Sequence, residues 1–108
     1  MMMLHHCNRN RQAGECTMRI AVIPAYKPDE KLLHVLEEVR AAGLRPIVVD
    51  DGSGPEYVEL FLQSQRHAHL IGYSRNKGKG HALKTAFAYI RNEYAGRRAA
   101  VVTLDCDG

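Results

Sequence analysis

Two carboxylates lie near the carboxyl end of the chain, in the sequence Leu104-Asp105-Cys106-Asp107-Gly108. They follow an apolar run from Ala99 to Leu104, which is typical of a buried strand. Side chains two positions apart on an extended segment point to the same side. Two hard oxygen ligands on one side suit Mg²⁺ or Mn²⁺, and substrate phosphates can complete the shell. The pattern predicts a metal site at Asp105 and Asp107, although Asp and Gly are equally typical of a plain polar turn.

Three earlier apolar runs lead into residues of similar chemical character. The runs cover residues 19–23, 46–49 and 69–73, and the segments after them are Pro24-Ala25-Tyr26, Asp50-Asp51-Gly52-Ser53 and Asn76-Lys77-Gly78-Lys79-Gly80. Between the runs, apolar residues recur at helical spacing over 29–42, 53–62 and 83–94. In the second helical segment, Ser53 and Glu56 resemble a capping box. In the third, the expected buried stripe is Leu83, Ala86, Phe87, Ile90 and Tyr94, and Gly96 ends the helix.

The resulting order is β-α-β-α-β-α-β, which predicts an α/β fold with a Rossmann-like, three-layer, open parallel sheet and right-handed crossovers. In a parallel sheet all strands point one way. The polar segments must then lie together along the carboxyl edge, where open α/β sheets bind ligands. This clustering is the main argument for a functional site. The last strand has no expected outer neighbour, so Val101, Val102 and Leu104 are expected to be partly exposed.

The residues at this edge suit a nucleotide. Asp50 or Asp51 could accept hydrogen bonds from a base N–H or from ribose hydroxyls, while Ser53 caps the next helix. The segment 76–80 opens a helix, its glycines allow close approach of a ligand, and a helix start favours negative charge. Lys77 and Lys79 are equally consistent with a solvated turn. The segment is not a Walker A loop, because the required Gly-Lys-Ser/Thr is missing.

Composition narrows the class of protein. The chain has 108 residues, 45% of them hydrophobic, and a net charge of +3. These values are typical of one domain with a modest core. No apolar run approaches the ~20 residues of a membrane span, and no basic block with interleaved aromatics indicates nucleic-acid binding. The three cysteines are an odd number and fit no disulfide framework, which favours a reducing compartment and a cytoplasmic location. Cys106 is expected to be a small buried side chain that fills space and faces away from the aspartates.

Residues 1–17 differ from the rest of the chain, because they show no apolar period and lack the apolar core of a signal peptide. We expect a disordered extension over 1–17 and a folded domain over 18–108. His5, His6, Cys7 and Cys16 do not have the spacing of a closed tetrahedral metal site.

The four segments in order resemble a known family. The matching motifs are Ile23-Pro-Ala-Tyr26, Val48-Val-Asp-Asp-Gly-Ser53, Asn76-x-Gly-x-Gly-x-Ala-Leu83 and Leu104-Asp-x-Asp-Gly108. Together they resemble the nucleotide-binding half of a family 2 glycosyltransferase with the GT-A fold, from about Arg19 to Gly108. The nearest subgroup transfers sugars to polyprenyl or dolichyl phosphate.

The resemblance implies a nucleotide-sugar donor, usually a UDP-sugar or a GDP-sugar, and a divalent metal, Mn²⁺ or Mg²⁺. By position, Pro24, Ala25 and Tyr26 would line the base pocket, and Asp51, or otherwise Asp50, would read the base. Gly78 and Gly80 would border the nucleotide. Asp105 and Asp107 would form the metal and diphosphate motif, in which the metal neutralises charge on the leaving diphosphate.

The family also continues beyond the Asp-x-Asp strand into a half that binds the acceptor, which would be a polyprenyl phosphate or a saccharide. The chain is therefore expected to be a fragment that binds a donor without transferring sugar, with no catalytic base of its own, and its full-length parent could associate with the cytoplasmic face of a membrane. Two other interpretations stay open. One is a haloacid-dehalogenase-type phosphatase with Asp105 as nucleophile and Asp107 as acid or base. The other is a ligand-binding module without catalysis.

Overall fold

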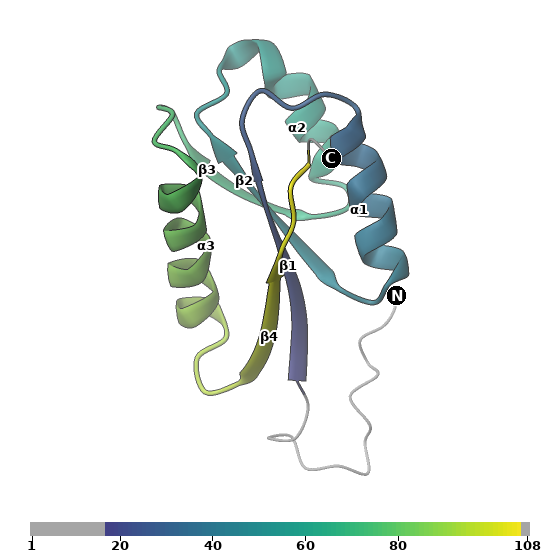
Figure 1. The fold of residues 1–108 in the computed structure, drawn as a ribbon, viewed down its shortest axis with the longest axis vertical. Helices are drawn as coiled ribbons and strands as arrows, with labels where there is room; N and C mark the ends of the chain where they lie inside the picture. Colours follow the sequence, from purple (N-terminus) through teal and green to yellow (C-terminus); the bar gives the residue numbers. More distant parts are fainter. Residues whose placement is uncertain (1–16, 107–108) are drawn as a thin grey trace.

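The computed structural model describes residues 17–106 (Figure 1). Along this range the elements are β1 (Thr17–Ala25), α1 (Lys31–Ala41), β2 (Arg45–Asp51), the 3₁₀ helix η3 (Pro55–Tyr57), α2 (Val58–Ser64), β3 (His69–Tyr73), α3 (Lys79–Glu93) and β4 (Arg98–Thr103). The strands form one sheet in the order β3-β2-β1-β4, and each neighbouring pair is parallel. The predicted α/β class and the alternation of strands and helices are confirmed.

Helices cover both faces of the sheet, which gives three layers (Figure 1). Alternate residues of β1 point to opposite faces, as the pleat requires. Ala21 and Ile23 pack in a buried cluster with residues of α1 and α2, whereas Ile20 and Val22 pack with residues of α3. The same alternation in β2 places Ile47 and Val49 on the α3 face. Asp51 continues that alternation, so β2 delivers it to the side of the sheet where α3 begins.

The direction of strand addition reverses at β1. The chain places β2 and then β3 on one side of β1, crosses the sheet through α3, and adds β4 on the other side of β1. Where connections leave in opposite directions, the carboxyl ends of the two strands open a crevice that binds ligands in open α/β sheets. In this chain the crevice lies between the ends of β1 and β4. The register continues past β4, because Leu104 N donates to Val22 O at 2.9 Å.

The predicted capping box is wrong. Helix η3 begins at Pro55 and α2 at Val58, and no side-chain cap is formed at either start. Ser53 is instead held in the turn after β2, since its backbone N donates to Asp50 Oδ1 at 2.9 Å. Its hydroxyl accepts a hydrogen bond from Lys27 N at 2.9 Å. Ser53 therefore joins the loop after β1 to the loop after β2.

The predicted buried stripe of α3 is confirmed except at Phe87, because Ala86 and Ile90 are buried and Leu83 and Tyr94 pack against the same cluster. The residues of α3 that are buried are Ala82, Ala86 and Ile90, which follow one another at i, i+4 and i+8. Phe87 is 43% exposed, contrary to expectation. One residue turns a helix by about 100°, so a stripe centred on Ala82 and Ala86 carries Phe87 away from the sheet. The small alanine side chains also let α3 approach the strands closely.

Strand β1 begins at Thr17, one residue before the predicted domain boundary, and Thr17 is the register partner of Arg98 in β4. The rest of the predicted disordered extension, including His5, His6, Cys7 and Cys16, lies outside the described residues. Between residues 17 and 106, the helices are too short or too polar to cross a bilayer.

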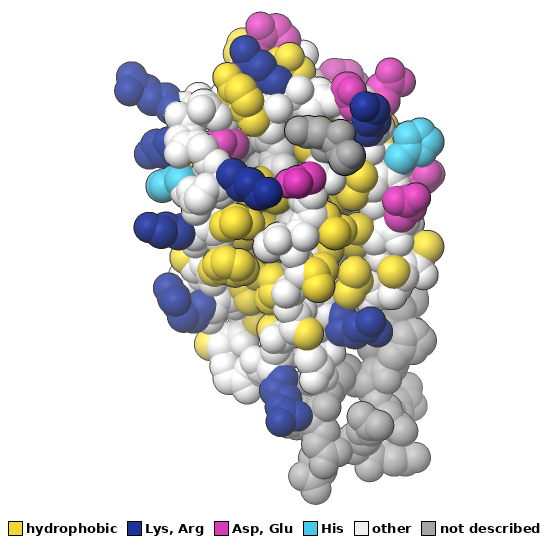
Figure 2. Space-filling view, viewed as in Figure 1, with side chains coloured by type: hydrophobic (Ala, Val, Ile, Leu, Met, Phe, Trp, Pro, Cys, Tyr) yellow, Lys and Arg dark blue, Asp and Glu magenta, His cyan; other side chains and the backbone are white. Residues whose placement is uncertain are grey.

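Strand β4 lies at the edge of the sheet. Val102 is 45% exposed and Leu104 is 36% exposed, and Val101 is half-buried, as expected. Figure 2 shows hydrophobic side chains gathered on the face where β4 lies in Figure 1.

Candidate functional site

The structure brings residues from all four predicted segments to one pocket of about 320 Å³ at the carboxyl edge. The pocket lies in the crevice between the ends of β1 and β4, where the strand order reverses. The lining residues are Pro24, Ala25, Tyr26, Asp51, Asn76, Gly78, Lys79, Asp105 and Cys106. The sequence placed all of these at the edge, but it assigned Cys106 only a packing role.

Five of the candidate site residues do not line this pocket: Asp50, Gly52, Ser53, Lys77 and Gly80. Asp107, the second predicted metal ligand, lies outside the described residues. The half-buried Asp50 has its Oδ1 engaged by the backbone N of Ser53. Of the two adjacent aspartates, Asp51 is therefore the one that faces the pocket.

Asp51 is 3% exposed, and both its carboxylate oxygens accept hydrogen bonds from the chain. Oδ1 accepts from the Tyr73 hydroxyl at 2.7 Å and from Lys77 N at 2.9 Å. Oδ2 accepts from Asn76 Nδ2 at 2.9 Å and from Gly78 N at 3.0 Å. A buried carboxylate is costly unless such donors surround it. Asp51 thus fastens the loop before α3 to the end of β2, and this network was not foreseen from the sequence.

Close backbone contact reinforces the same junction. Gly52 has a φ of +69°, and a Cβ at this position would lie 2.2 Å from Arg75 C and from Asn76 N. No larger residue fits without moving one of the two loops. Gly78, at the start of α3, also has a positive φ, of +94°. A Cβ on Gly80, in contrast, would meet no atom within 4 Å, so the packing of the described residues does not require glycine there.

The start of α3 carries positive charge toward the pocket. Its first turn contains no acidic residue, and no side-chain cap is formed there by the residues described. Lys79 is the first residue of the helix, and Lys77 precedes it with its ammonium 5.8 Å from the centre of the Tyr73 ring. Backbone N–H groups at a helix start and nearby lysines together favour an anionic ligand.

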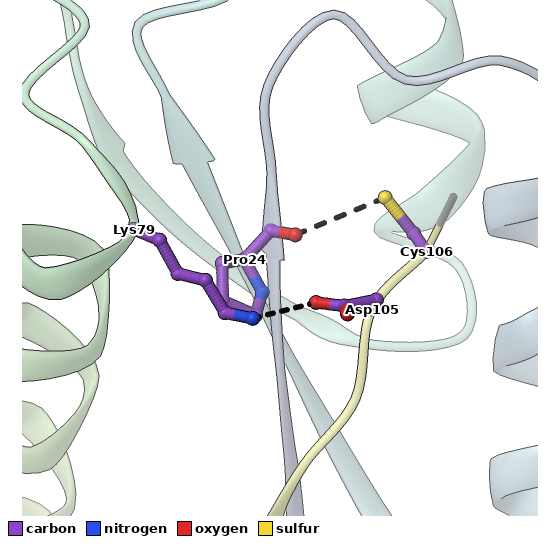
Figure 3. A network of polar contacts seen from close by, with 4 residues as sticks. All are labelled: Pro24, Lys79, Asp105 and Cys106. Carbon is purple, nitrogen blue, oxygen red and sulfur yellow. Dashed lines mark hydrogen bonds and ion pairs between the residues drawn. The ribbon is translucent and has the colours of Figure 1, made fainter. Parts of the chain in front are cut away.

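Opposite α3, the segment after β4 supplies negative charge. Asp105 Oδ1 lies 2.8 Å from Lys79 Nζ. Figure 3 shows the two side chains reaching toward one another beside Pro24. The next residue, Cys106, is 4% exposed and directs its Sγ to Pro24 O at 3.8 Å. Cys106 packs in the core as the predicted small filler, but it also lines the pocket beside Asp105 rather than facing away from it.

The donor chemistry fits a divalent cation at Asp105. Its carboxylate lines the pocket and already holds a positive group, the Lys79 ammonium, in a position that a hard cation could take. Among residues 17–106 there is no cluster of three His, Cys, Asp or Glu side chains that could hold a metal ion. A cation at Asp105 would thus depend on further oxygens, such as those of a substrate diphosphate.

Tyr73 has a strongly raised pKa, chiefly because burial disfavours its charged form and also because its hydroxyl donates to Asp51. The folded state therefore keeps the phenol protonated where an unfolded tyrosine loses its proton. Its contribution to stability is full below the ordinary pKa of 10.0 and declines as pH rises above that value.

The difference in unfolding free energy between the wild type and Tyr73→Phe should therefore be constant below about pH 9 and shrink above about pH 10. Urea denaturation over this range measures it. A difference that stays constant to about pH 11 would contradict the assigned hydrogen bond between Tyr73 and Asp51.

Comparison with known proteins agrees with these observations. The family model described as "Glycosyl transferase family 2" matches residues 20–108. The chain is also 35% identical over 81 residues to "Uncharacterized protein MJ0544" of Methanocaldococcus jannaschii, an alignment that covers 69% of this chain and 35% of the relative. The chain thus spans about a third of the length of this curated relative. No solved structure matches the chain significantly.

Proposed function

Because this chain belongs to glycosyl transferase family 2, we propose that it binds the nucleoside diphosphate part of a UDP-sugar or GDP-sugar at the carboxyl edge of its sheet. The observation that carries the proposal is the pocket between the ends of β1 and β4. It combines an exposed aromatic ring, a helix start with the lysine Lys79, and a carboxylate able to hold a cation. A base, a diphosphate and a metal ion need these three features.

In this proposal the base lies against Pro24, Ala25 and Tyr26. Tyr26 is 47% exposed, so its ring offers a face on which a base can stack. Asp51 then acts mainly through the loop that it holds. The base-reading role predicted for Asp51, or for Asp50, stays a prediction, and it would require an N–H of the base to share an oxygen already engaged by the chain.

The diphosphate lies between α3 and Asp105. Asn76 and Gly78 supply backbone that approaches closely, and Lys79 in the first turn of α3 supplies positive charge; Lys77, which does not line the pocket, adds to the positive charge nearby. Mn²⁺ or Mg²⁺ would be held by Asp105, and by Asp107 as the sequence predicts. When bound, the metal would neutralise charge on the leaving diphosphate. The residues of the chain orient the donor and keep its phosphates beside the cation.

The complete reaction is the transfer of the sugar to an acceptor, for which we propose a polyprenyl phosphate or a saccharide. The chain spans about a third of its relative, so the acceptor site and any catalytic base are assigned to residues beyond those of this chain. A cytoplasmic location, at the membrane face for a lipid acceptor, is part of the same proposal. An ionised phosphate acceptor would need little help from a base.

The family match favours this function over the two alternatives that the sequence left open. A phosphatase with Asp105 as nucleophile would leave the lining at Pro24–Tyr26 and the loop before α3 without a role. A module that binds ligand without catalysis agrees with the pocket, and it differs from the proposal only in the absence of sugar transfer by the parent protein.

Calorimetric titration of the chain with UDP, GDP, CDP and TDP, each with Mn²⁺, tests the proposal. We expect one of UDP and GDP to bind at least about tenfold more tightly than inorganic diphosphate, because the base adds contacts worth ~1.4 kcal/mol or more. Removing Mn²⁺ with EDTA should weaken that binding.

Asp105→Asn should abolish the response to EDTA, and Glu93→Gln, at the far end of α3, serves as its control. Equal affinity for all four nucleotides and for inorganic diphosphate would overturn the proposed base pocket. An unchanged EDTA response in Asp105→Asn would overturn the metal assignment.

A further inference from the structure

The ion pair between Lys79 and Asp105 joins the two sides of the pocket. It links the first residue of α3 to the segment after β4 at a distance of 2.8 Å. Both side chains are well exposed, with 59% of the lysine and 65% of the aspartate accessible. Both side chains are therefore accessible to a metal ion or a ligand from solution.

The position of Lys79 is unfavourable for the helix itself. The start of a helix carries partial positive charge, so a lysine there is repelled whereas an acidic residue would be attracted. The first turn of α3 contains no acidic residue, and Lys77 adds a second positive charge close by. The Lys79 ammonium forms an ion pair with the Asp105 carboxylate. The Asp51 carboxylate at Gly78 N offsets part of this repulsion, but helix stability still does not favour a lysine here, whereas a role in the pocket would.

We propose that the Lys79 ammonium and a divalent cation compete for the Asp105 carboxylate, so that metal binding releases Lys79 to contact the phosphates of the ligand. The competition follows from the observed pair, because an ammonium and a divalent cation in contact with the same carboxylate repel one another, so each weakens the binding of the other. The release toward phosphates rests on the proposed function.

The two parts of the inference predict opposite effects of one substitution. Lys79→Met keeps the length of the side chain and removes its charge. Without its competitor, Mn²⁺ should bind about two- to fivefold more tightly, which is the range expected for an exposed ion pair. Nucleoside diphosphate should bind about fivefold or more weakly, because a charge-assisted contact to phosphate is lost.

Lys84→Met is the matched control, since Lys84 is an exposed lysine of α3 one turn further along the helix. It changes the net charge equally and makes no ion pair with Asp105. Mn²⁺ affinity is measured with the metal alone, by electron paramagnetic resonance of free Mn²⁺. UDP and GDP are titrated separately, in EDTA and then in Mn²⁺. A third variant, Asp105→Asn, should make Mn²⁺ binding insensitive to Lys79→Met.

Each outcome has a distinct meaning. Tighter Mn²⁺ binding in Lys79→Met than in Lys84→Met, lost when Asp105 is also replaced, supports the competition. Unchanged or weaker Mn²⁺ binding in Lys79→Met, or no Mn²⁺ binding by any variant, overturns it. If the competition is observed but neither nucleotide binds the wild type, the proposed function fails while the exchange at Asp105 stands. If nucleotides bind equally well to Lys79→Met and Lys84→Met, the release of Lys79 toward phosphate is overturned.

Discussion

Replacing Asp51 with alanine is expected to destabilise the domain by ~2–4 kcal/mol, because four donors lose their shared acceptor. The Tyr73 hydroxyl and the backbone N–H groups of the loop before α3 would need water or other partners. Domains of this size are typically stable by only ~5–15 kcal/mol, so the loss is a large fraction of the total. Urea denaturation followed by circular dichroism measures it.

Asp50→Ala is the matched control, since among the described residues the neighbouring aspartate accepts a hydrogen bond from Ser53 N. Its expected cost is ~1 kcal/mol. The destabilisation by Asp51→Asn should fall between the two. The amide keeps one oxygen as an acceptor, but its NH₂ group is itself a donor and cannot accept the hydrogen bonds that the replaced oxygen accepted. Equal losses in Asp50→Ala and Asp51→Ala would show that the Asp51 network does not hold the loop.

The second large effect is expected at Gly52. Alanine there is strained by the positive φ of +69° and would also place its Cβ 2.2 Å from Arg75 C and from Asn76 N. Backbone atoms cannot rotate away as a flexible side chain can, so one loop must move. We expect Gly52→Ala to cost ~3 kcal/mol or more, of which the strain alone accounts for ~1–2 kcal/mol.

Gly43→Ala separates the two causes. Gly43 has a similar φ of +82°, but a Cβ there would meet no atom within 4 Å. Its cost should be that of the strain alone, ~1–2 kcal/mol. Thermal unfolding of both variants gives the comparison, and nucleotide titration adds a second readout, because only Gly52→Ala should displace the loop beside the pocket. Equal destabilisation by the two substitutions would contradict the close contact between the loops.

The sheet and the gathering of polar segments at its carboxyl edge could be predicted from the sequence, because the period of apolar residues is a local property. Runs such as 46–49 identify buried strands, and the parallel direction follows from the helices between them. Ends of elements were less certain, since fraying and continued pairing depend on neighbours. Strand β1 reaches back to Thr17 because Arg98 of β4 is its register partner there. The burial of Ala82 and the exposure of Phe87 in α3 depend in the same way on which small residues fit against the strands.

The interior of the site could not be predicted from the same pattern. The hydrogen bonds of Asp51 join residues 22 to 27 positions apart, and nothing in the local sequence specifies such pairs. Ser53 has the composition of a helix cap, yet the turn around Asp50 directs its hydroxyl to Lys27. The pair of Lys79 and Asp105 arises only when α3 and β4 meet across the reversal in strand order. The local sequence pattern thus predicted which residues lie at the carboxyl edge, whereas their contacts with one another depend on how the strands and helices are connected.

The position of β1 between β2 and β4 also orders events during protein synthesis. Strand β1 is synthesised before β4, so one of its edges has no partner until β4 has left the ribosome. The contact between Pro24 and Cys106 likewise cannot form until 82 further residues have been added. At a synthesis rate of ~5–20 residues per second, that edge is unpaired for roughly 4–16 s. A nascent chain that ends between α3 and β4 exposes an apolar central strand to other chains. Codon choice and chaperone access over residues 79–103 are therefore expected to affect the yield of folded protein more than changes elsewhere in the gene.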